Sequence, residues 1–235
     1  MTSSSATNPP KTVAILQSNY IPWLGYFQLV NAVDEFIVYD QVQYTKNDWR
    51  NRNKIKSAQG AQWLSIPAGK SISRNIDEVE VRNPWRLKHW SSLEQAYRGA
   101  NGFDETAEWL APHYLGSEES NLSITNRSLL GDICAALEIP TRITSSRAYS
   151  LVGDRTERLV NLCLQSGATT YISGPAARGY LDQAKFAAQS IEVRWFDYPT
   201  EPPYRQLWGD FTPGLSAVDL LFNLGRKSAI YFRTM

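Results

Sequence analysis

The chain has little of what builds covalent or metal frameworks. It contains 2 cysteines and 2 histidines among 235 residues. Both cysteines, Cys134 and Cys163, fall inside apolar patterns with helical spacing, where a thiol is normally a buried free side chain. No group of these residues has the spacing of a disulfide framework or a zinc site. The sequence therefore predicts a fold held by its apolar core, without a metal centre.

The chain also lacks an excess of charge and long apolar runs. Lys and Arg number 24 against 23 Asp and Glu, so the net charge is +1 and no overall field attracts nucleic acid or a membrane surface. No apolar run approaches the length that spans a bilayer. Residues 1–11 lack the cationic and apolar parts of a signal peptide and predict a disordered tail. We therefore expect a cytoplasmic protein that binds neither nucleic acid nor membranes.

Cofactor motifs are missing as well. The sequence contains no P-loop, no G-x-S-x-G nucleophile turn and no dinucleotide-binding glycine motif. These absences argue against an ATPase, a serine hydrolase and an NAD enzyme. We expect no cofactor, and chemistry that needs only substrate positioning, a proton acceptor and a group that holds an anion.

Apolar segments alternate between strand and helix patterns. Residues 13–16 and 34–40 have the pattern of buried strands, and 24–33 between them has helical spacing, which predicts a parallel β-α-β unit. Further strands are predicted at 63–67, 77–81, 141–144, 169–174 and 192–196, and further helices at 85–98, 103–114, 122–138, 155–166, 180–188 and 216–224. The pattern indicates an α/β fold: a Rossmann-like, mostly parallel sheet with flanking helices and an all-α middle at about 85–138. Residues 12–235 are expected to form a single domain.

Polar and charged residues crowd the segment 41–54, which directly follows the second predicted strand. It holds four cations, three Asn, two Gln and two aromatic residues, a composition that does not suit an apolar core. Arginine binds carboxylate, sulfate or phosphate through two parallel hydrogen bonds, so Arg50 and Arg52 are predicted to hold an anion. A substrate site is favoured over a plain surface loop because ordinary loops use Gly, Pro and Ser.

Two residues are candidates for the proton acceptor. Asp40 ends the second predicted strand, and ligands of parallel sheets bind beyond the carboxyl ends of the strands. His89 lies among cations in a predicted helix, where a lowered pKa would make it a neutral base. Each has a structural alternative: Asp40 as a strand-end residue that accepts backbone hydrogen bonds, and His89 as a packing residue. If neighbouring cations lower the pKa of Asp40 strongly, it would orient an amine and His89 would be the base.

The substrate-binding residues are predicted near the same edge of the sheet. They are Gln17, Asn19, Tyr20, Trp23, Gln43, Tyr44, Lys46, Trp49, Arg50, Asn51, Arg52, Lys54, Ser173, Gly174 and Tyr180. Tyr198, Tyr204 and Gln206 could form a lid over the site or an oligomer contact with the same or a different chain. Asp219 and Asn223 fall on one face of the last predicted helix, which favours a buried structural network there.

Four segments carry a resemblance to a known family: QSNYIPWLGYF at 17–27, WRNRN at 49–53, ISG at 172–174 and LSAVDLLFN at 215–223. With them the chain resembles the WbqC-like protein family over about residues 12–228. The resemblance implies a bacterial gene cluster for O-antigen or for specialised metabolites such as antibiotics, and a role in adding an amino acid such as glycine to a sugar. The turn after the first strand is also similar to the phosphate-binding turn of nucleotidyltransferases. Those enzymes carry His where this chain has Tyr26, so nucleotide transfer is not expected.

Two classes of function follow. The first is a cofactor-independent enzyme, a transferase or a lyase or cyclase, that forms a C–N bond on a small polar anionic or amino-acid-like substrate. An amine would attack an acyl carbon, or would displace a sulfate or phosphate group held by Arg50 and Arg52, with ring closure. The second is a non-catalytic subunit that binds a partner protein or a sugar through exposed Trp and Tyr side chains.

Overall fold

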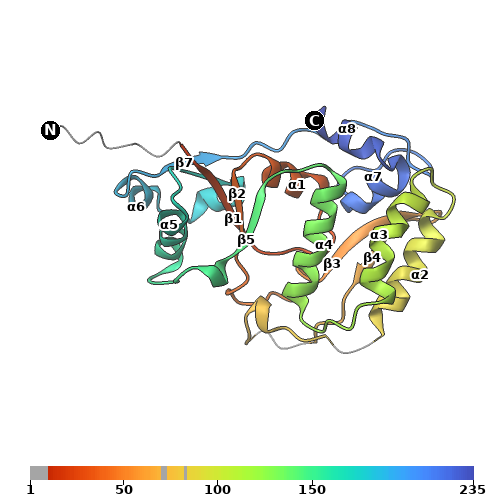
Figure 1. The fold of residues 1–235 in the computed structure, drawn as a ribbon, viewed down its shortest axis with the longest axis horizontal. Coiled ribbons are helices and arrows are strands. Elements are labelled where there is room, and N and C mark those ends of the chain that lie inside the picture. The colour runs from red at the N-terminus through yellow and green to blue at the C-terminus, as the bar shows by residue number, and fades with distance from the viewer. Residues whose placement is uncertain (1–9, 70–72, 82–83) are drawn as a thin grey trace.

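The computed structural model describes residues 10–69, 73–81 and 84–235 (Figure 1). Residues 1–9, most of the tail predicted to be disordered, lie outside the described residues. Lys11 was predicted to belong to that tail, but it is bound to the folded chain. Its Nζ donates to Glu35 Oε2 at 2.7 Å and to the carbonyl of Ser166 at 2.6 Å.

A five-stranded parallel sheet forms one part of the molecule. Its strands are β1 (Thr12–Leu16), β2 (Glu35–Val38), β5 (Arg142–Ser145), β6 (Thr170–Ser173) and β7 (Glu192–Trp195). They lie in the order β5-β2-β1-β6-β7, and all neighbouring pairs are parallel. From β1 the chain adds β2 and β5 on one side and then β6 and β7 on the other, so the strand order reverses between β1 and β6. This confirms the predicted Rossmann-like α/β fold.

Alternate side chains of the strands enter two separate apolar cores. Val13 and Ile15 pack with residues of α5 (Arg155–Ser166) and α6 (Gln183–Ala187), whereas Ala14 belongs to the core that includes α1 (Leu24–Asn31). Figure 1 accordingly shows α5 and α6 on one side of the sheet and α1 on the other. Successive residues of a strand point to opposite faces, so a sheet covered on both faces needs continuously apolar strands.

The second part of the molecule is mostly helical. It contains α2 (Trp85–Tyr97), α3 (Phe103–Leu115), α4 (Leu122–Ala136), α7 (Ala217–Leu224) and α8 (Lys227–Arg233). An antiparallel hairpin of β3 (Arg52–Ser57) and β4 (Gly60–Ser65) packs against α2 and α7. The helical middle segment is thus confirmed, and Figure 1 shows that the C-terminal helices join it.

Several predicted elements need correction. The strand predicted at 77–81 is wrong: a 3-10 helix, η1 (Ile76–Glu78), occupies its start because Asn75 and Glu78 form a capping box. The strand predicted at 63–67 is β4, but it lies in the hairpin and not in the main sheet. Residues 180–188 contain only the short α6, which follows a 3-10 helix, η3 (Pro175–Gly179). β3 and α8 were not predicted.

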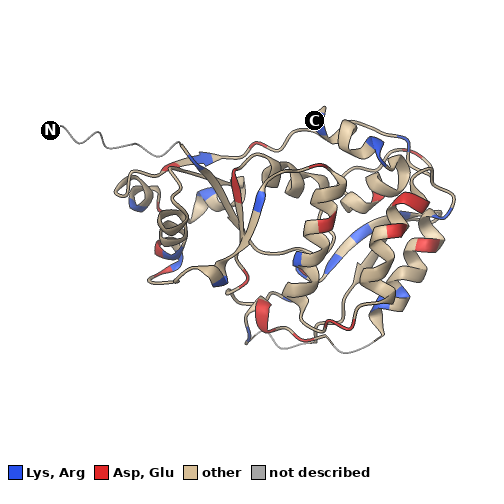
Figure 2. Cartoon of the chain, in the orientation of Figure 1, with Lys and Arg blue, Asp and Glu red and all other residues tan. Residues whose placement is uncertain are grey.

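The burial of the cysteines and the distribution of charge agree with the sequence analysis. Cys134 and Cys163 are buried free thiols, as predicted. Figure 2 shows Lys and Arg interspersed with Asp and Glu in both parts of the molecule, as a net charge of +1 leads one to expect. Among the helices in the described ranges, none combines the length and the apolar character needed to cross a bilayer.

Candidate functional site at the carboxyl edge of the sheet

A cavity of about 860 Å³ opens where the strand order reverses. Its wall includes the ends of β1 and β6, the first residue after β2, part of the segment 41–54 and the start of α5. The polar and aromatic side chains that line it are those of Gln17, Tyr39, Gln43, Thr45, Asp48, Arg50, Asp154, Arg155, Arg158, Tyr171, Ser173, Tyr180 and Tyr198. Both the size and the position are those of small-molecule sites in open parallel sheets.

The turn from β1 into α1 shapes one side of this edge. The hydroxyl of Tyr26 donates to the carbonyl of Gln17 at 3.0 Å, which ties the end of β1 to the helix. Trp23 directly precedes α1, and its ring lies so close to Gly25 that a Cβ at Gly25 would be 2.3 Å from it. The same ring packs against Tyr198, with centroids 5.3 Å apart, and Tyr198 lines the cavity. Glycine at position 25 is therefore required for this aromatic wall.

Arg50 is the cation that the protein holds most firmly at the cavity. One terminal nitrogen donates to Asn19 Oδ1, and the other donates to Gln17 Oε1 at 3.3 Å. The Asp48 carboxylate lies 3.8 Å away, and the Arg50 side chain is 15% exposed. The backbone is fixed too, because Asn126 on α4 donates to the Arg50 carbonyl at 2.8 Å. A guanidinium held in this way loses little freedom when it binds an anion.

Asp48 is the carboxylate beside Arg50. Burial alone would raise its pKa, but the hydrogen bond from the Thr45 hydroxyl, at 2.6 Å, and the charge of Arg50 lower the pKa below its ordinary value. The Trp49 N–H also donates to it, at 2.7 Å. Asp48 and Arg50 together present opposite charges to the cavity, a pair that complements a zwitterion such as an amino acid.

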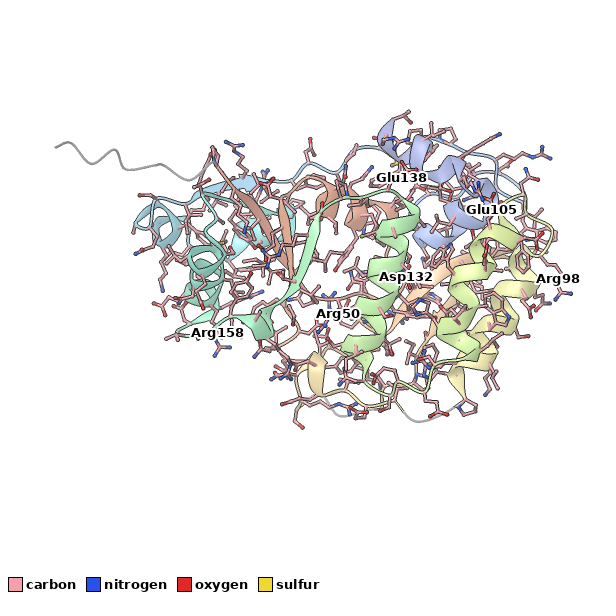
Figure 3. All side chains as sticks on the ribbon, viewed as in Figure 1. Arg50, Arg98, Glu105, Asp132, Glu138 and Arg158 are labelled. Carbon is pink, nitrogen blue, oxygen red and sulfur yellow. The ribbon has the colours of Figure 1, made fainter. Side chains whose placement is uncertain are left out.

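A second group of cations lies at the start of α5. The Arg155 guanidinium lies 3.6 Å from the centroid of the Tyr180 ring, and all three of Arg155, Arg158 and Tyr180 line the cavity. Figure 3 shows Arg158 extending from α5 and Arg50 in the middle of the molecule. Neither Asp48 nor the two arginines were predicted as site residues. The signal available was that the helix following the third strand of the sheet begins D-R-T-E-R, which places its first turn at this edge.

Asp40, the predicted base, lies behind the cavity and does not line it. It is buried, and each carboxylate oxygen accepts a hydrogen bond: Oδ1 from the Ser18 N–H at 2.8 Å and Oδ2 from the Ser123 hydroxyl. Its carbonyl also accepts from the Asp77 N–H at 3.2 Å. In this geometry Asp40 joins the end of β1 to α4 and so positions the loop that carries Gln17 and Asn19.

His89, the second predicted base, lies in the helical part. It is buried, and Tyr20 connects it to Tyr114: the Tyr20 oxygen is 2.8 Å from His89 Nδ1 and 2.7 Å from the Tyr114 oxygen. Burial lowers the pKa of His89 to about 4, and a hydrogen bond with the Ser65 backbone opposes this. His89 does not line the cavity and is not brought close to Asp40 by any contact among the described residues.

The structure separates Arg52 and Lys54 from Arg50. Arg52 and Lys54 are two positions apart and so lie on the same face of β3. Arg52 Cζ is 4.4 Å and Lys54 Nζ is 4.9 Å from the centroid of the Trp63 ring. Trp49 packs beside Trp63, with centroids 5.8 Å apart, and the two rings are 44% and 41% exposed. The predicted fork of two arginines around one anion is therefore divided between the cavity and an outer surface.

The remaining predicted binding residues fall into two groups. Gln43, Ser173, Gly174 and Tyr180 line the cavity, as Gln17 and Arg50 do. Those outside its wall are Asn19, which holds Arg50; Tyr20, Tyr44 and Asn51, which are buried; Trp23, which packs on Tyr198; and Lys46, which is exposed.

A buried network in the helical part accounts for the polar residues near the C-terminus. Asp219 accepts hydrogen bonds from Tyr97, at 2.7 Å, Tyr204, at 2.7 Å, and Gln206, at 2.9 Å. Lys56 donates to Gln206 Oε1 at 2.7 Å. Tyr204 and Gln206 are thus part of the core, and only Tyr198 reaches the cavity. In residues 10–69, 73–81 and 84–235, no three His, Cys, Asp or Glu side chains gather as a metal site requires.

The fold and the cavity define a class: a doubly wound α/β protein with a cavity lined by charged side chains at the reversal of strand order. Within that class the chain belongs to the WbqC-like protein family, whose family pattern matches residues 17–231. It is 50% identical over 226 residues to an uncharacterized protein of Mycobacterium tuberculosis (strain ATCC 25618 / H37Rv), Rv1507c, covering 95% of this chain and 98% of that one. No solved structure matches the chain.

Proposed function

We propose that the protein is a cofactor-independent biosynthetic enzyme that forms a C–N bond on a small polar anionic substrate. The reaction is amino-acid or acyl transfer to an amine or amino sugar, or displacement of a sulfate or phosphate group by an amine with ring closure. The family resemblance supports a bacterial O-antigen or specialised-metabolite pathway in the cytoplasm. The observation that carries the proposal is Arg50, held by protein groups at the wall of the cavity.

Arg50 binds the anionic group of the substrate. Its side chain is 15% exposed, so a ligand that reaches it is largely removed from water, where a charge-assisted hydrogen bond is strongest. In an acyl transfer the guanidinium orients a carboxylate. In a displacement it stabilises the negative charge that gathers on the departing sulfate or phosphate as the amine attacks carbon.

Asp48 binds the amine in this proposal. Its lowered pKa suits a counter-ion that holds an ammonium group and makes Asp48 a weak base, so the ammonium group releases its proton to water before the neutral amine attacks. The catalytic roles predicted for Asp40 and His89 stay predictions. Since both are enclosed by protein contacts outside the cavity, we assign Asp40 the role of positioning Gln17 and Asn19 through Ser18.

The proposal is tested with Arg50→Ala and the matched control Arg52→Ala. Both proteins and the wild type are incubated with the small-molecule fraction of cells fed with ¹⁵N, and mass spectrometry follows consumed compounds and new ¹⁵N-containing products. A product made by the wild type and the Arg52→Ala variant, and lost in Arg50→Ala, supports the proposal. If the wild type consumes nothing, or if the Arg50→Ala variant makes the same products, the proposed enzyme function is wrong.

A second candidate is a non-catalytic subunit that binds a sugar or a partner protein. The exposed Trp49 and Trp63 rings, with Arg52 and Lys54 beside them, favour it because such surfaces suit ring stacking and protein contacts. In that case Trp49→Ala with Trp63→Ala would abolish the biological activity while anion binding at Arg50 persists. The enzyme proposal expects the opposite dependence.

A further inference from the structure

We propose that Arg155 and Arg158 at the mouth of the cavity form a phosphate subsite, so that the substrate is a phosphorylated amino-acid-like molecule. Its phosphate would bind at α5, and its zwitterionic end would bind at Arg50 and Asp48. This assignment rests on the function proposed above, in the form in which Arg50 orients a carboxylate, because it takes Arg50 and Asp48 as the other end of the same substrate.

The two arginines are pre-positioned. Arg155 is stacked on the Tyr180 ring at 3.6 Å, and Arg158 Nε donates to the Gly153 carbonyl at 3.1 Å. Among the residues that the structure describes, the terminal nitrogens of Arg158 have no hydrogen-bond partner and neither arginine has a carboxylate partner. Two guanidinium groups three positions apart on one helix face, with their terminal nitrogens free, suit the several oxygens of a phosphate.

The acids nearby do not neutralise these arginines. Asp154 and Glu157 both pair with Lys185, at 2.5 Å and 3.0 Å, and form the capping box of α5. The backbone N–H groups at the start of the helix are thus occupied by Asp154, and the binding groups are the side chains of Arg155 and Arg158. The mouth of the cavity therefore carries a net positive charge.

The inner end of the cavity, marked by the 15%-exposed Arg50 in contrast to the exposed Arg155 and Arg158 at the mouth, has a different charge balance. There Asp48 accompanies Arg50, so the pair is neutral overall and complements a group that carries both charges. A cavity of about 860 Å³ is larger than a bare amino acid needs, and both sets of side chains line it. A molecule with a phosphate at one end and an amino acid at the other matches this arrangement.

Isothermal titration calorimetry at low salt tests the assignment with O-phospho-L-serine, L-serine, inorganic phosphate and ADP. We expect the wild type to bind phosphoserine at least about tenfold more tightly than serine or phosphate, since charge-assisted hydrogen bonds add at the second end. The double variant Arg155→Ala, Arg158→Ala should lose this gain and bind serine as the wild type does. Arg50→Ala should weaken serine and phosphoserine binding and leave phosphate binding unchanged.

The control is Arg98→Ala, since Arg98 is 74% exposed and Figure 3 places it at the far end of the molecule from Arg158. It should bind every ligand as the wild type does. Should the double alanine variant unfold early, Arg155→Gln with Arg158→Gln takes its place, because glutamine keeps the length and helix propensity without the charge.

The outcomes separate the two proposals. Equal affinity for serine and phosphoserine, or a gain that survives in the Arg155, Arg158 variant, overturns the phosphate subsite. Tighter binding of ADP than of phosphoserine, independent of Arg50, overturns the amino-acid-like class of substrate. If the Arg155→Ala, Arg158→Ala variant loses phosphate binding, the phosphate subsite is supported. If Arg50→Ala at the same time binds serine and phosphoserine as the wild type does, the proposed role of Arg50 is wrong.

Discussion

The cavity edge of the sheet and the helical part use the same residue types in opposite ways. In the helical part, Asp219 is fully buried and accepts hydrogen bonds from Tyr97, Tyr204 and Gln206. At the cavity edge, the Asp48 and Arg50 side chains line the cavity and are 30% and 15% exposed, although protein groups bind both of them. The difference teaches that a charged residue is available for a ligand only where its side chain reaches a cavity, and a buried one serves the fold.

The largest effect is expected at Asp219. Asp219→Ala leaves three buried donors without their acceptor, which should lower the free energy of unfolding by about 3–5 kcal/mol. Denaturant titration measures this. Glu138→Ala is the control, because Glu138 is 60% exposed and its loss should change stability by less than about 0.5 kcal/mol. Similar stabilities for the two variants would contradict the structural role of the network.

The next effect concerns pH. His89 has a pKa of about 4 in the folded chain, against 6.5 when unperturbed, so unfolding takes up a proton between these values. Its contribution to stability is complete above about pH 6.5 and is lost as the pH falls toward 4, by up to about 1.4 kcal/mol per pH unit and about 3 kcal/mol in all. Thermal melting of wild type and His89→Gln across this range should show a shallower slope in the variant. Parallel slopes would exclude His89 as the cause.

Arg50→Ala should act on binding and not on folding. The loss of charge-assisted hydrogen bonds predicts affinity for acidic amino acids weaker by about 10- to 100-fold, with little change in melting temperature. Arg52→Ala, two positions along, should bind within about twofold of the wild type because Arg52 stacks on Trp63 outside the cavity. Thermal shift and calorimetry with the acidic amino acids glutamate and aspartate check both. Equal losses of affinity in the two variants would instead indicate that Arg50 and Arg52 bind one anion together, as the sequence predicted.

The smallest effect is expected for Asp40→Asn. The Asn oxygen can keep the bond from the Ser18 N–H, but its NH2 group then faces Ser123, whose hydroxyl must turn to accept, at a cost of about 1–2 kcal/mol in stability. Binding at Arg50 should stay within about twofold of the wild type. A variant of unchanged stability that loses nearly all product formation would instead establish Asp40 as the base.

The pattern of apolar residues along the chain predicted the strands of the parallel sheet. The segments at 13–16, 34–40, 141–144, 169–174 and 192–196 were each predicted as strands, and all five lie in the parallel sheet. A strand buried on both faces is apolar throughout, so its signal is local. β3 escaped detection because Arg52 and Lys54 form its outer face, while buried Asn53 on its inner face donates to the Ile21 carbonyl at 2.8 Å. Polar residues on both faces hide the alternation of a strand.

Part of the site was predicted from the positions of the strand ends. Gln17, Arg50, Ser173 and Gly174 could be named because strand ends of a parallel sheet meet at one edge. Arg155 is more than one hundred residues from Arg50 along the chain, and no local pattern relates the two. Arg50 lies in the turn before β3, whereas Arg52 is the first residue of β3, so the two arginines reach different surfaces, which composition cannot show.

The sequence by itself determined the α/β class, the parallel sheet, the family and the edge at which polar groups gather, because these depend on local periodicity and on short motifs. Only the tertiary structure decided which charges remain available. Whether Asp40 or Asp48 faces the cavity depends on the donors that Ser18 and Ser123 bring from distant segments. Burial is a property of the packed molecule, so a carboxylate that resembles a base in the sequence can be enclosed in the fold, while Asp48, with as many hydrogen bonds, remains open to the cavity.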